Sequence, residues 1–144
     1  MNTQTETAVD EPRPRALVIE DSEHTAYLLA FMLERAGYEV TTIRNGRDAE
    51  ALIKSGQGFD VTLLDLMLPH IDGFELLTQM REHPSWRTVP ILILSGKVLE
   101  SDVVRAFELG ASDYVTKPFR PQELLARVNR LLRDYRPQVS RQHG

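Results

Sequence analysis

Five polar residues stand directly after short apolar runs, and their side chains suit the binding of a hard metal ion beside a fixed positive charge. Together they provide three carboxylates, a hydroxyl group and an ammonium group. A short apolar run that ends abruptly in a polar residue is typical of a buried strand that delivers this residue to the rim of a sheet. We therefore predict that these side chains meet at one rim; they belong to Glu20, Asp21, Asp65, Ser95 and Lys117.

Strand and helix patterns alternate five times along the chain, which predicts a parallel sheet with helices on both faces. In such a sheet the carboxyl ends of all strands share one rim, where ligands bind. Helical spacing predicts inward faces with Tyr27, Leu28, Met32 and Leu33 in the first helix, and with Val103, Val104 and Phe107 in the fourth. The expected strands are residues 15–20, 39–44, 61–64, 90–94 and 114–116.

The composition is that of one ordinary globular domain. The 144 residues are 42% hydrophobic and carry a net charge of −4, which disfavours broad binding to nucleic acid. The absence of cysteine excludes disulfides and zinc–thiolate sites. Residues 1–14 and 136–144 are polar, so we expect a disordered N-terminal tail and a flexible C-terminal tail around a domain at 15–135.

Neither a membrane span nor export is expected. The apolar runs are far shorter than the roughly 20 residues that a membrane-spanning helix needs. The N-terminus is polar and acidic and lacks the apolar region of a secretory signal. We therefore expect a cytoplasmic protein without membrane contact.

The three carboxylates need compensation if the first and third strands are neighbours in the sheet. Two like charges about 4 Å apart repel by roughly 4 kcal/mol at an effective dielectric constant near 20. Either one carboxyl group keeps its proton, or a cation lies between the groups. Oxygen ligands without histidine or cysteine suit Mg²⁺, and Lys117 supplies a second positive charge.

Five motifs follow one another along the chain: Glu20-Asp21, Asp65–Pro69, Asp72-Gly73, Ser95-Gly96 and Gly110–Phe119. Through this combination, which is highly specific, the sequence resembles the receiver domains of two-component response regulators from about Arg15 to Arg133. The resemblance implies a flavodoxin-like α/β fold, a doubly wound five-stranded parallel sheet in the order 2-1-3-4-5 with five flanking helices. This strand order comes from the resemblance, and it makes the first and third strands neighbours.

The resemblance implies a phosphoacceptor site. Asp65 would accept a phosphoryl group from a sensor histidine kinase or a histidine phosphotransfer protein. Mg²⁺ would be bound by Asp21, Asp65 and the backbone carbonyl of Met67, with Glu20 acting through water. Lys117 would pair with Asp65 and then with a phosphoryl oxygen. Such a site is plausible because phosphoryl transfer depends mainly on positioning and charge neutralisation.

The resemblance also implies a switch. Ser95 would hydrogen-bond the phosphoryl group and draw the following loop inward, and Tyr114 would rotate from an exposed to a buried position. The change would reach the face formed by the fourth helix, the fifth strand and the fifth helix, for partner binding or dimerisation. Pro118 is expected to follow a cis peptide bond, as in the family.

Charged residues on this face resemble those that receivers of winged-helix transcription factors use for a symmetric homodimer. The set is incomplete, because Ser112 and Asp134 stand where those relatives usually carry Asp and Arg. Exposed charge pairs contribute under about 1 kcal/mol each, so a homodimer is only one candidate. The residues are Arg105, Glu108, Asp113, Glu123 and Arg127.

Three other functions compete with a phosphoacceptor switch that carries out only self-directed phosphotransfer and autodephosphorylation. A phosphatase of the haloacid dehalogenase type would have a second Asp where this chain has Met67. A flavin- or nucleotide-binding module would need a Gly- or Ser/Thr-rich loop after the first strand. A degenerate receiver would lack part of the acid, hydroxyl and lysine set, which is complete here.

The arrangement of the whole protein stays open at this point. The chain is either a stand-alone regulator or a receiver cut from a larger transcription factor or other effector. The sequence does not specify the cognate kinase, the downstream target, the oligomeric state or the lifetime of the phosphoryl group.

Overall fold

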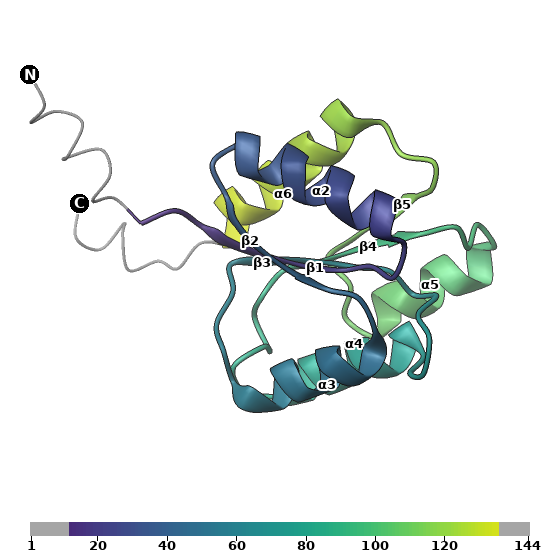
Figure 1. The fold of residues 1–144 in the computed structure, drawn as a ribbon. Coiled ribbons are helices and arrows are strands. Elements are labelled where there is room, and N and C mark those ends of the chain that lie inside the picture. The colour runs from purple at the N-terminus through teal and green to yellow at the C-terminus, as the bar shows by residue number, and fades with distance from the viewer. Residues whose placement is uncertain (1–11, 136–144) are drawn as a thin grey trace, which may run out of the picture.

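The computed structural model describes residues 12–135, which form a five-stranded parallel sheet between two layers of helices (Figure 1). The strand order is β2-β1-β3-β4-β5, as the resemblance implied. The strands are β1 (Arg15–Ile19), β2 (Glu39–Ile43), β3 (Val61–Leu64), β4 (Ile91–Ser95) and β5 (Asp113–Thr116). The helices are α2 (Glu23–Arg35), α3 (Gly46–Ser55), α4 (Gly73–Glu82), α5 (Glu100–Glu108) and α6 (Pro121–Tyr135).

Each of the five strands begins and ends within one residue of its predicted bounds.

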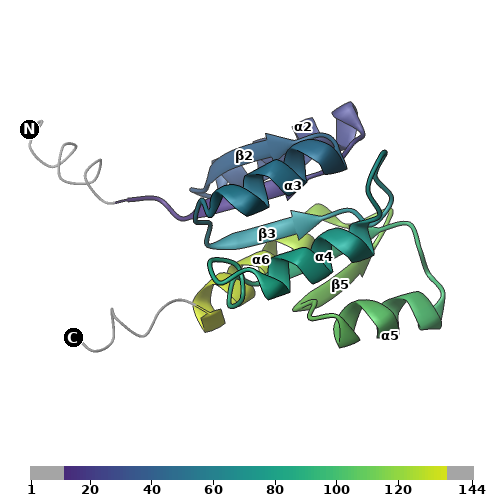
Figure 2. The same cartoon turned by 90° about the horizontal axis from the view of Figure 1, so that it is seen from below.

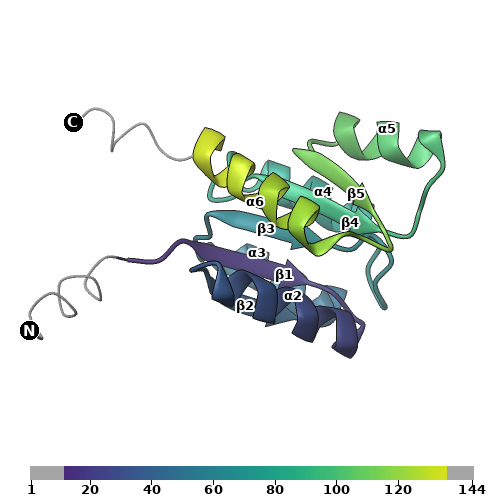
Figure 3. The same ribbon diagram turned by 90° about the horizontal axis from the view of Figure 1, so that it is seen from above.

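Helices α3, α4 and α5 lie on one side of the sheet (Figure 2), and α2 and α6 lie on the other (Figure 3). The predicted disordered and flexible tails lie outside the described residues, apart from residues 12–14. Of these, Pro14 accepts a hydrogen bond of 2.8 Å from the Glu39 N–H, at the start of the β1–β2 ladder. No helix within residues 12–135 is both long and apolar enough to cross a membrane.

The core has two halves, one on each face of the sheet. In β1, Leu17 and Ile19 pack with residues of α3 and α4, whereas Ala16 and Val18 pack with residues of α2 and α6. The central strands β3 and β4 are buried along their whole length. Burial on both faces explains why these strands read as continuous apolar runs, which end only where the chain leaves the sheet.

The predicted inward faces of two helices are wrong in part: Leu33 of α2 is buried as predicted, but Tyr27 and Leu28 are not. In α2 the buried residues are Ala26, Leu29 and Leu33, and Tyr27 is 72% exposed. Residues at spacings of three and four share a face of a helix, so burial of this set turns Tyr27 and Leu28 outward. Several neighbouring apolar residues in α2 made more than one face compatible with the sequence.

Helix α5 covers less of the sheet than its pattern predicted. Ala106 is its buried residue and Val103 is partly buried, while Val104 and Phe107 are 45% and 46% exposed. The reason is position, because α5 lies beside the edge strand β5 (Figure 2). The face predicted to point inward is therefore largely open to solvent.

The far end of α5 is fixed by Arg81, which extends from α4. Its Nε donates to the Gly110 carbonyl at 2.9 Å, and its Nη1 donates to the carbonyls of Trp86 at 2.9 Å and Val89 at 2.7 Å. Its Nη2 donates to the Ser112 hydroxyl at 3.4 Å. Burial lowers the pKa of the Arg81 guanidinium. One side chain thus joins the ends of α4 and α5 and the start of β5.

Candidate functional site

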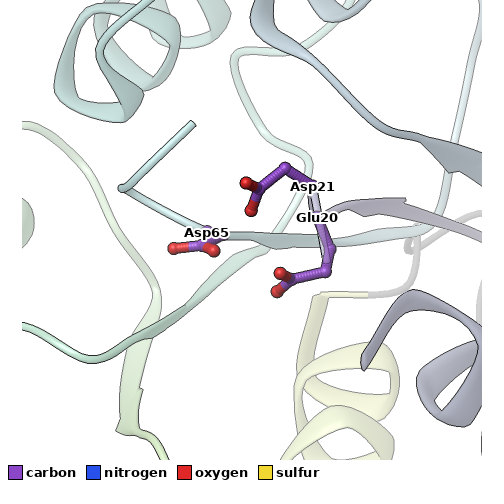
Figure 4. A group of neighbouring side chains, drawn as sticks. All are labelled: Glu20, Asp21 and Asp65. Carbon is purple, nitrogen blue, oxygen red and sulfur yellow. The ribbon is translucent and has the colours of Figure 1, made fainter. Parts of the chain in front are cut away.

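Three carboxylates lie together at the carboxyl ends of two neighbouring strands (Figure 4). Glu20 and Asp21 follow β1, and Asp65 follows β3, which is hydrogen-bonded to β1. One carboxylate oxygen from each residue lies within 4.8 Å of the others. Glu20 and Asp65 are 1% and 4% exposed, whereas Asp21 faces solvent. The structure thus brings the three predicted acids into one cluster that is open at Asp21.

Lys117 compensates part of this negative charge. It follows β5, and its Nζ lies 2.8 Å from Glu20 Oε1 and 3.1 Å from Asp65 Oδ2. Burial disfavours the ammonium form, but the hydrogen bonds to Glu20 and Asp65 outweigh it and raise the pKa of Lys117. Burial also raises the pKa of Glu20, despite the opposing contact with Lys117. The peptide bond between Lys117 and Pro118 is cis.

The loop after Asp65 holds this carboxylate in place. Oδ1 of Asp65 accepts a hydrogen bond of 2.9 Å from the backbone N–H of Met67, whose side chain is exposed. The Gly73 N–H, at the start of α4, donates to the Leu66 carbonyl at 3.0 Å. A Cβ atom on Gly73 would lie 2.4 Å from the Leu66 Cα, so only glycine permits this close approach. Asp65 therefore has one oxygen held by Met67 and the other by Lys117.

Ser95 and Tyr114 are linked through the main chain of Lys97. Ser95 is the last residue of β4 and is fully buried, and its hydroxyl accepts a hydrogen bond of 3.2 Å from the Lys97 N–H. The hydroxyl of Tyr114 in β5 donates to the Lys97 carbonyl at 2.8 Å. Burial raises the pKa of Tyr114, which is partly buried in this structure. The predicted rotation of Tyr114 stays a prediction.

The charges of the expected dimer face interact mainly within the chain. Arg127 Nη1 lies 3.1 Å from Asp113 Oδ2, and its Nη2 lies 3.1 Å from Glu123 Oε2. The guanidinium carbon of Arg105 lies 4.1 Å from the centre of an aromatic ring of α4. Glu108 is exposed on α5. The structure therefore pairs three of the five residues with one another and places Arg105 elsewhere.

The donor set of the acid cluster fits a hard divalent cation. All three side chains offer oxygen, and the exposed Asp21 gives access from solvent. Mg²⁺ is typically bound by one or two carboxylates and keeps several waters, which such an open cluster permits. Over residues 12–135, no other group of three His, Cys, Asp or Glu side chains converges in this way.

Sequence reasoning missed one residue of this rim, Arg44. It follows β2 directly, and its Nε and Nη2 donate to the backbone carbonyl of Asp21 at 3.2 and 3.0 Å. The signal that could have identified Arg44 is its position, because the end of β2 lies at the same rim as the end of β1.

Residues 16–129 match the response regulator receiver domain family. The chain is 41% identical over 126 residues to the phosphate regulon transcriptional regulatory protein PhoB of Rhizobium meliloti strain 1021, over 88% of this chain and 55% of the relative. It is 43% identical over 119 residues to the alkaline phosphatase synthesis transcriptional regulatory protein PhoP of Bacillus subtilis strain 168. This match covers 83% of this chain and 48% of that relative. The chain spans about half the length of these curated relatives.

A solved structure is similar in both fold and sequence. It is the receiver domain of the sensor histidine kinase PA1611 from Pseudomonas aeruginosa PAO1, with a magnesium ion coordinated in its active-site cleft. The TM-score is 0.75 and the identity 30%, over 84% of this chain and 98% of that one. The chain therefore belongs to the response regulator receiver domain family of two-component signalling proteins, as shown by the strand order, the family match over residues 16–129 and these identities.

Proposed function

We propose that the chain is a phosphoacceptor switch that receives a phosphoryl group on Asp65 from a phosphohistidine of a sensor histidine kinase or a histidine phosphotransfer protein. A carboxylate oxygen of Asp65 attacks the phosphorus, the bond between phosphorus and the histidine nitrogen breaks, and the electron pair of that bond stays on the imidazole. The observation that carries this proposal is the environment of Asp65, with Met67 N–H at one oxygen and Lys117 at the other.

Mg²⁺ would be held by Asp21, Asp65 and the Met67 carbonyl, with Glu20 acting through water. When bound, it would neutralise negative charge on the phosphoryl oxygens, and the magnesium-bound relative supports this assignment. The residues of the chain contribute positioning and fixed charge, which are the main requirements of phosphoryl transfer. Lys117 holds Asp65 before transfer and is placed to contact a phosphoryl oxygen after it.

The switch would act through the loop that follows β4. A hydrogen bond from the Ser95 hydroxyl to the new phosphoryl group would move Lys97, because the Lys97 N–H is bonded to Ser95. Tyr114 would move with it, because its hydroxyl is bonded to the Lys97 carbonyl. The face formed by α5, β5 and α6 would then change for partner binding or dimerisation. The exposed Val104 and Phe107 offer apolar contact area on that face.

A receiver within a larger protein is the second candidate arrangement. The observation that favours it is the length of the transcriptional regulators, of which this chain covers 55% and 48%. In that case the switched face would act on a fused effector rather than on a separate protein.

The test is incubation with acetyl phosphate and Mg²⁺, followed by intact-mass spectrometry. We expect the mass of one added phosphoryl group, which EDTA prevents and Asp65→Asn abolishes. Asp134→Asn, an exposed carboxylate on α6, is the matched control and should be modified like the wild type. Incorporation into Asp65→Asn, or none into the wild type from either acetyl phosphate or a phosphohistidine donor, would refute the proposal.

A further inference from the structure

Arg44 extends toward the acid cluster from a strand that carries none of its carboxylates. Strands β1 and β2 pair in parallel up to Ile19 and Ile43, and the ladder continues with a bond of 3.0 Å from the Glu20 N–H to the Ile43 carbonyl. Arg44 is therefore the next residue at the shared rim. Its guanidinium donates through Nε and Nη2 to one acceptor, the Asp21 carbonyl.

The three carboxylates of the cluster are held differently. Glu20 accepts hydrogen bonds from Ser22 and Lys117, and Asp65 accepts them from Met67 and Lys117. Across the described part of the chain, the Asp21 side chain has no hydrogen bond or ion pair. Its position depends on its main chain, and the guanidinium beside it binds the carbonyl and leaves both carboxylate oxygens free.

The turn that carries Arg44 is itself fixed. The Asn45 side chain caps α3 by accepting from the Asp48 N–H at 2.8 Å. The Gly46 N–H donates to the Pro69 carbonyl at 3.3 Å, and a Cβ atom on Gly46 would lie 2.7 Å from the Ile71 Cβ. Arg44 thus joins the turn after β1, which holds Asp21, to a turn packed against the loop that follows Asp65.

We propose that Arg44 is a positioning residue for the metal site, which holds the main chain of Asp21 so that its free carboxylate is preorganised for a divalent cation. This inference rests on the Mg²⁺ site of the proposed function. Arg44 contacts Asp21 without occupying a carboxylate oxygen, in contrast to Lys117, which occupies oxygens of Glu20 and Asp65.

The two effects of Arg44 on Mg²⁺ affinity have opposite signs. Holding Asp21 strengthens binding, because less conformational freedom is lost when the ion binds. Charge repulsion weakens binding, but Arg44 is exposed, so the high dielectric constant of the surrounding water reduces this effect, and salt reduces it further. We expect the positioning effect to outweigh the repulsion in 150 mM salt, so a variant without Arg44 should bind Mg²⁺ more weakly.

The experiment is a calorimetric Mg²⁺ titration in about 150 mM salt, with the amide NMR signals of Asp21 and Ser22 as a second readout. Arg44→Met should raise the Kd about three- to tenfold, the factor that corresponds to the net contribution of one hydrogen bond. Arg44→Lys keeps the charge but loses the planar fork, so it should also raise the Kd. The matched control is Arg47→Met, which removes an equal charge from an exposed position on α3 and should not raise the Kd.

The outcomes separate this inference from the proposed function. A Kd for Arg44→Met equal to or below that of Arg47→Met would overturn the inference while leaving the metal site intact. A lowered Kd for Arg44→Met beside a wild-type Kd for Arg44→Lys would overturn it as well, since charge repulsion alone would then account for the effect. A wild type that binds no Mg²⁺ would overturn both the metal site and the role of Arg44. A similar melting temperature of all variants in EDTA identifies a loss of affinity as local rather than a loss of fold.

Discussion

Replacement of Lys117 by methionine tests whether this ammonium group is what makes the buried carboxylates tolerable. Methionine keeps most of the apolar stem and removes the two contacts with Glu20 and Asp65, at 2.8 and 3.1 Å. Loss of one partner of a buried ion pair leaves an uncompensated charge, which typically costs 3–5 kcal/mol. The variant protein can avoid part of this cost by protonating Glu20.

Protonation sets an upper bound on the part of the stability loss that comes from Glu20. The ordinary pKa of a glutamate is 4.5, so keeping a proton on Glu20 at pH 7 costs 2.5 pH units at 1.36 kcal/mol each, or about 3.4 kcal/mol. At pH 5 the same cost is about 0.7 kcal/mol. In the variant Lys117 no longer opposes the effect of burial, so the pKa of Glu20 is raised further. A raised carboxyl pKa means that stability falls as the pH rises from 4.5 toward the pKa of the folded state.

The lysine side of the pair does not contribute to this pH dependence. The pKa of Lys117 is raised above 10.5 in the fold, so its stabilising contribution is fully present below 10.5 and is lost only as the pH rises through the folded pKa. Between pH 5 and 7 the difference between wild type and variant should therefore grow by up to about 1.4 kcal/mol per pH unit. Mg²⁺ should reduce this difference, because it supplies positive charge to the same carboxylates.

The assay is urea unfolding in EDTA at several pH values, monitored by the fluorescence of Trp86, the single and fully buried tryptophan. At pH 7 we expect a loss of about 3 kcal/mol, or roughly 10 °C in melting temperature. The matched control is Lys54→Met, at an exposed position on α3, which should change stability little at any pH. The electrostatic reasoning would be refuted if Lys117→Met were as stable as the wild type at pH 7. It would also be refuted if the stability difference between the two proteins did not change between pH 5 and 7.

Three further substitutions test the site and its supports. Asp21→Asn should raise the melting temperature in EDTA by a few degrees, because it removes an exposed charge within 4.8 Å of its neighbours and so adds about 1 kcal/mol to the stability. The same substitution should abolish stabilisation by Mg²⁺ in thermal scans. Tyr114→Phe should lower the free energy of unfolding by about 1 kcal/mol, because the hydrogen bond to the Lys97 carbonyl is lost. It should also reduce the NMR response of that loop to beryllofluoride, and an unaltered response would mean that the tyrosine hydroxyl takes no part in the switch. Gly73→Ala should lower the free energy of unfolding in urea by about 3 kcal/mol, because the new Cβ atom would overlap Leu66. Wild-type stability of this variant would mean that the loop after β3 can move aside.

The residues that the sequence predicted well are those that follow buried strands. Asp65 and Lys117 stand where apolar runs stop, and in a parallel sheet such endings share one rim. This argument alone could not place β1 beside β3, because periodicity carries no information on strand order. The family resemblance supplied the order, and with it the proximity of Glu20 to Asp65.

The features that escaped prediction depend on tertiary packing. Tyr27 and Leu28 lie in a helix with apolar residues on several sides, so the buried face is decided by contact with the sheet. Phe107 is exposed because α5 lies at an edge rather than over the centre of the sheet. Arg44 looks in sequence like any solvated arginine, since its role depends on the direction of one backbone carbonyl across the rim.

The attachment of Arg81 to Gly110 limits how α5 can transmit a signal. The C-terminal end of the helix is tied to α4, whereas its N-cap, Leu99, has no side-chain capping bond and follows the loop that contains Lys97. A helix of nine residues is about 14 Å long, so if the proposed switch pulls on that loop, we expect α5 to tilt about its tethered end and its N-terminal end to move most. A partner that senses the proposed switch should then contact the first turn of α5, around Leu99, rather than the surface near Glu108.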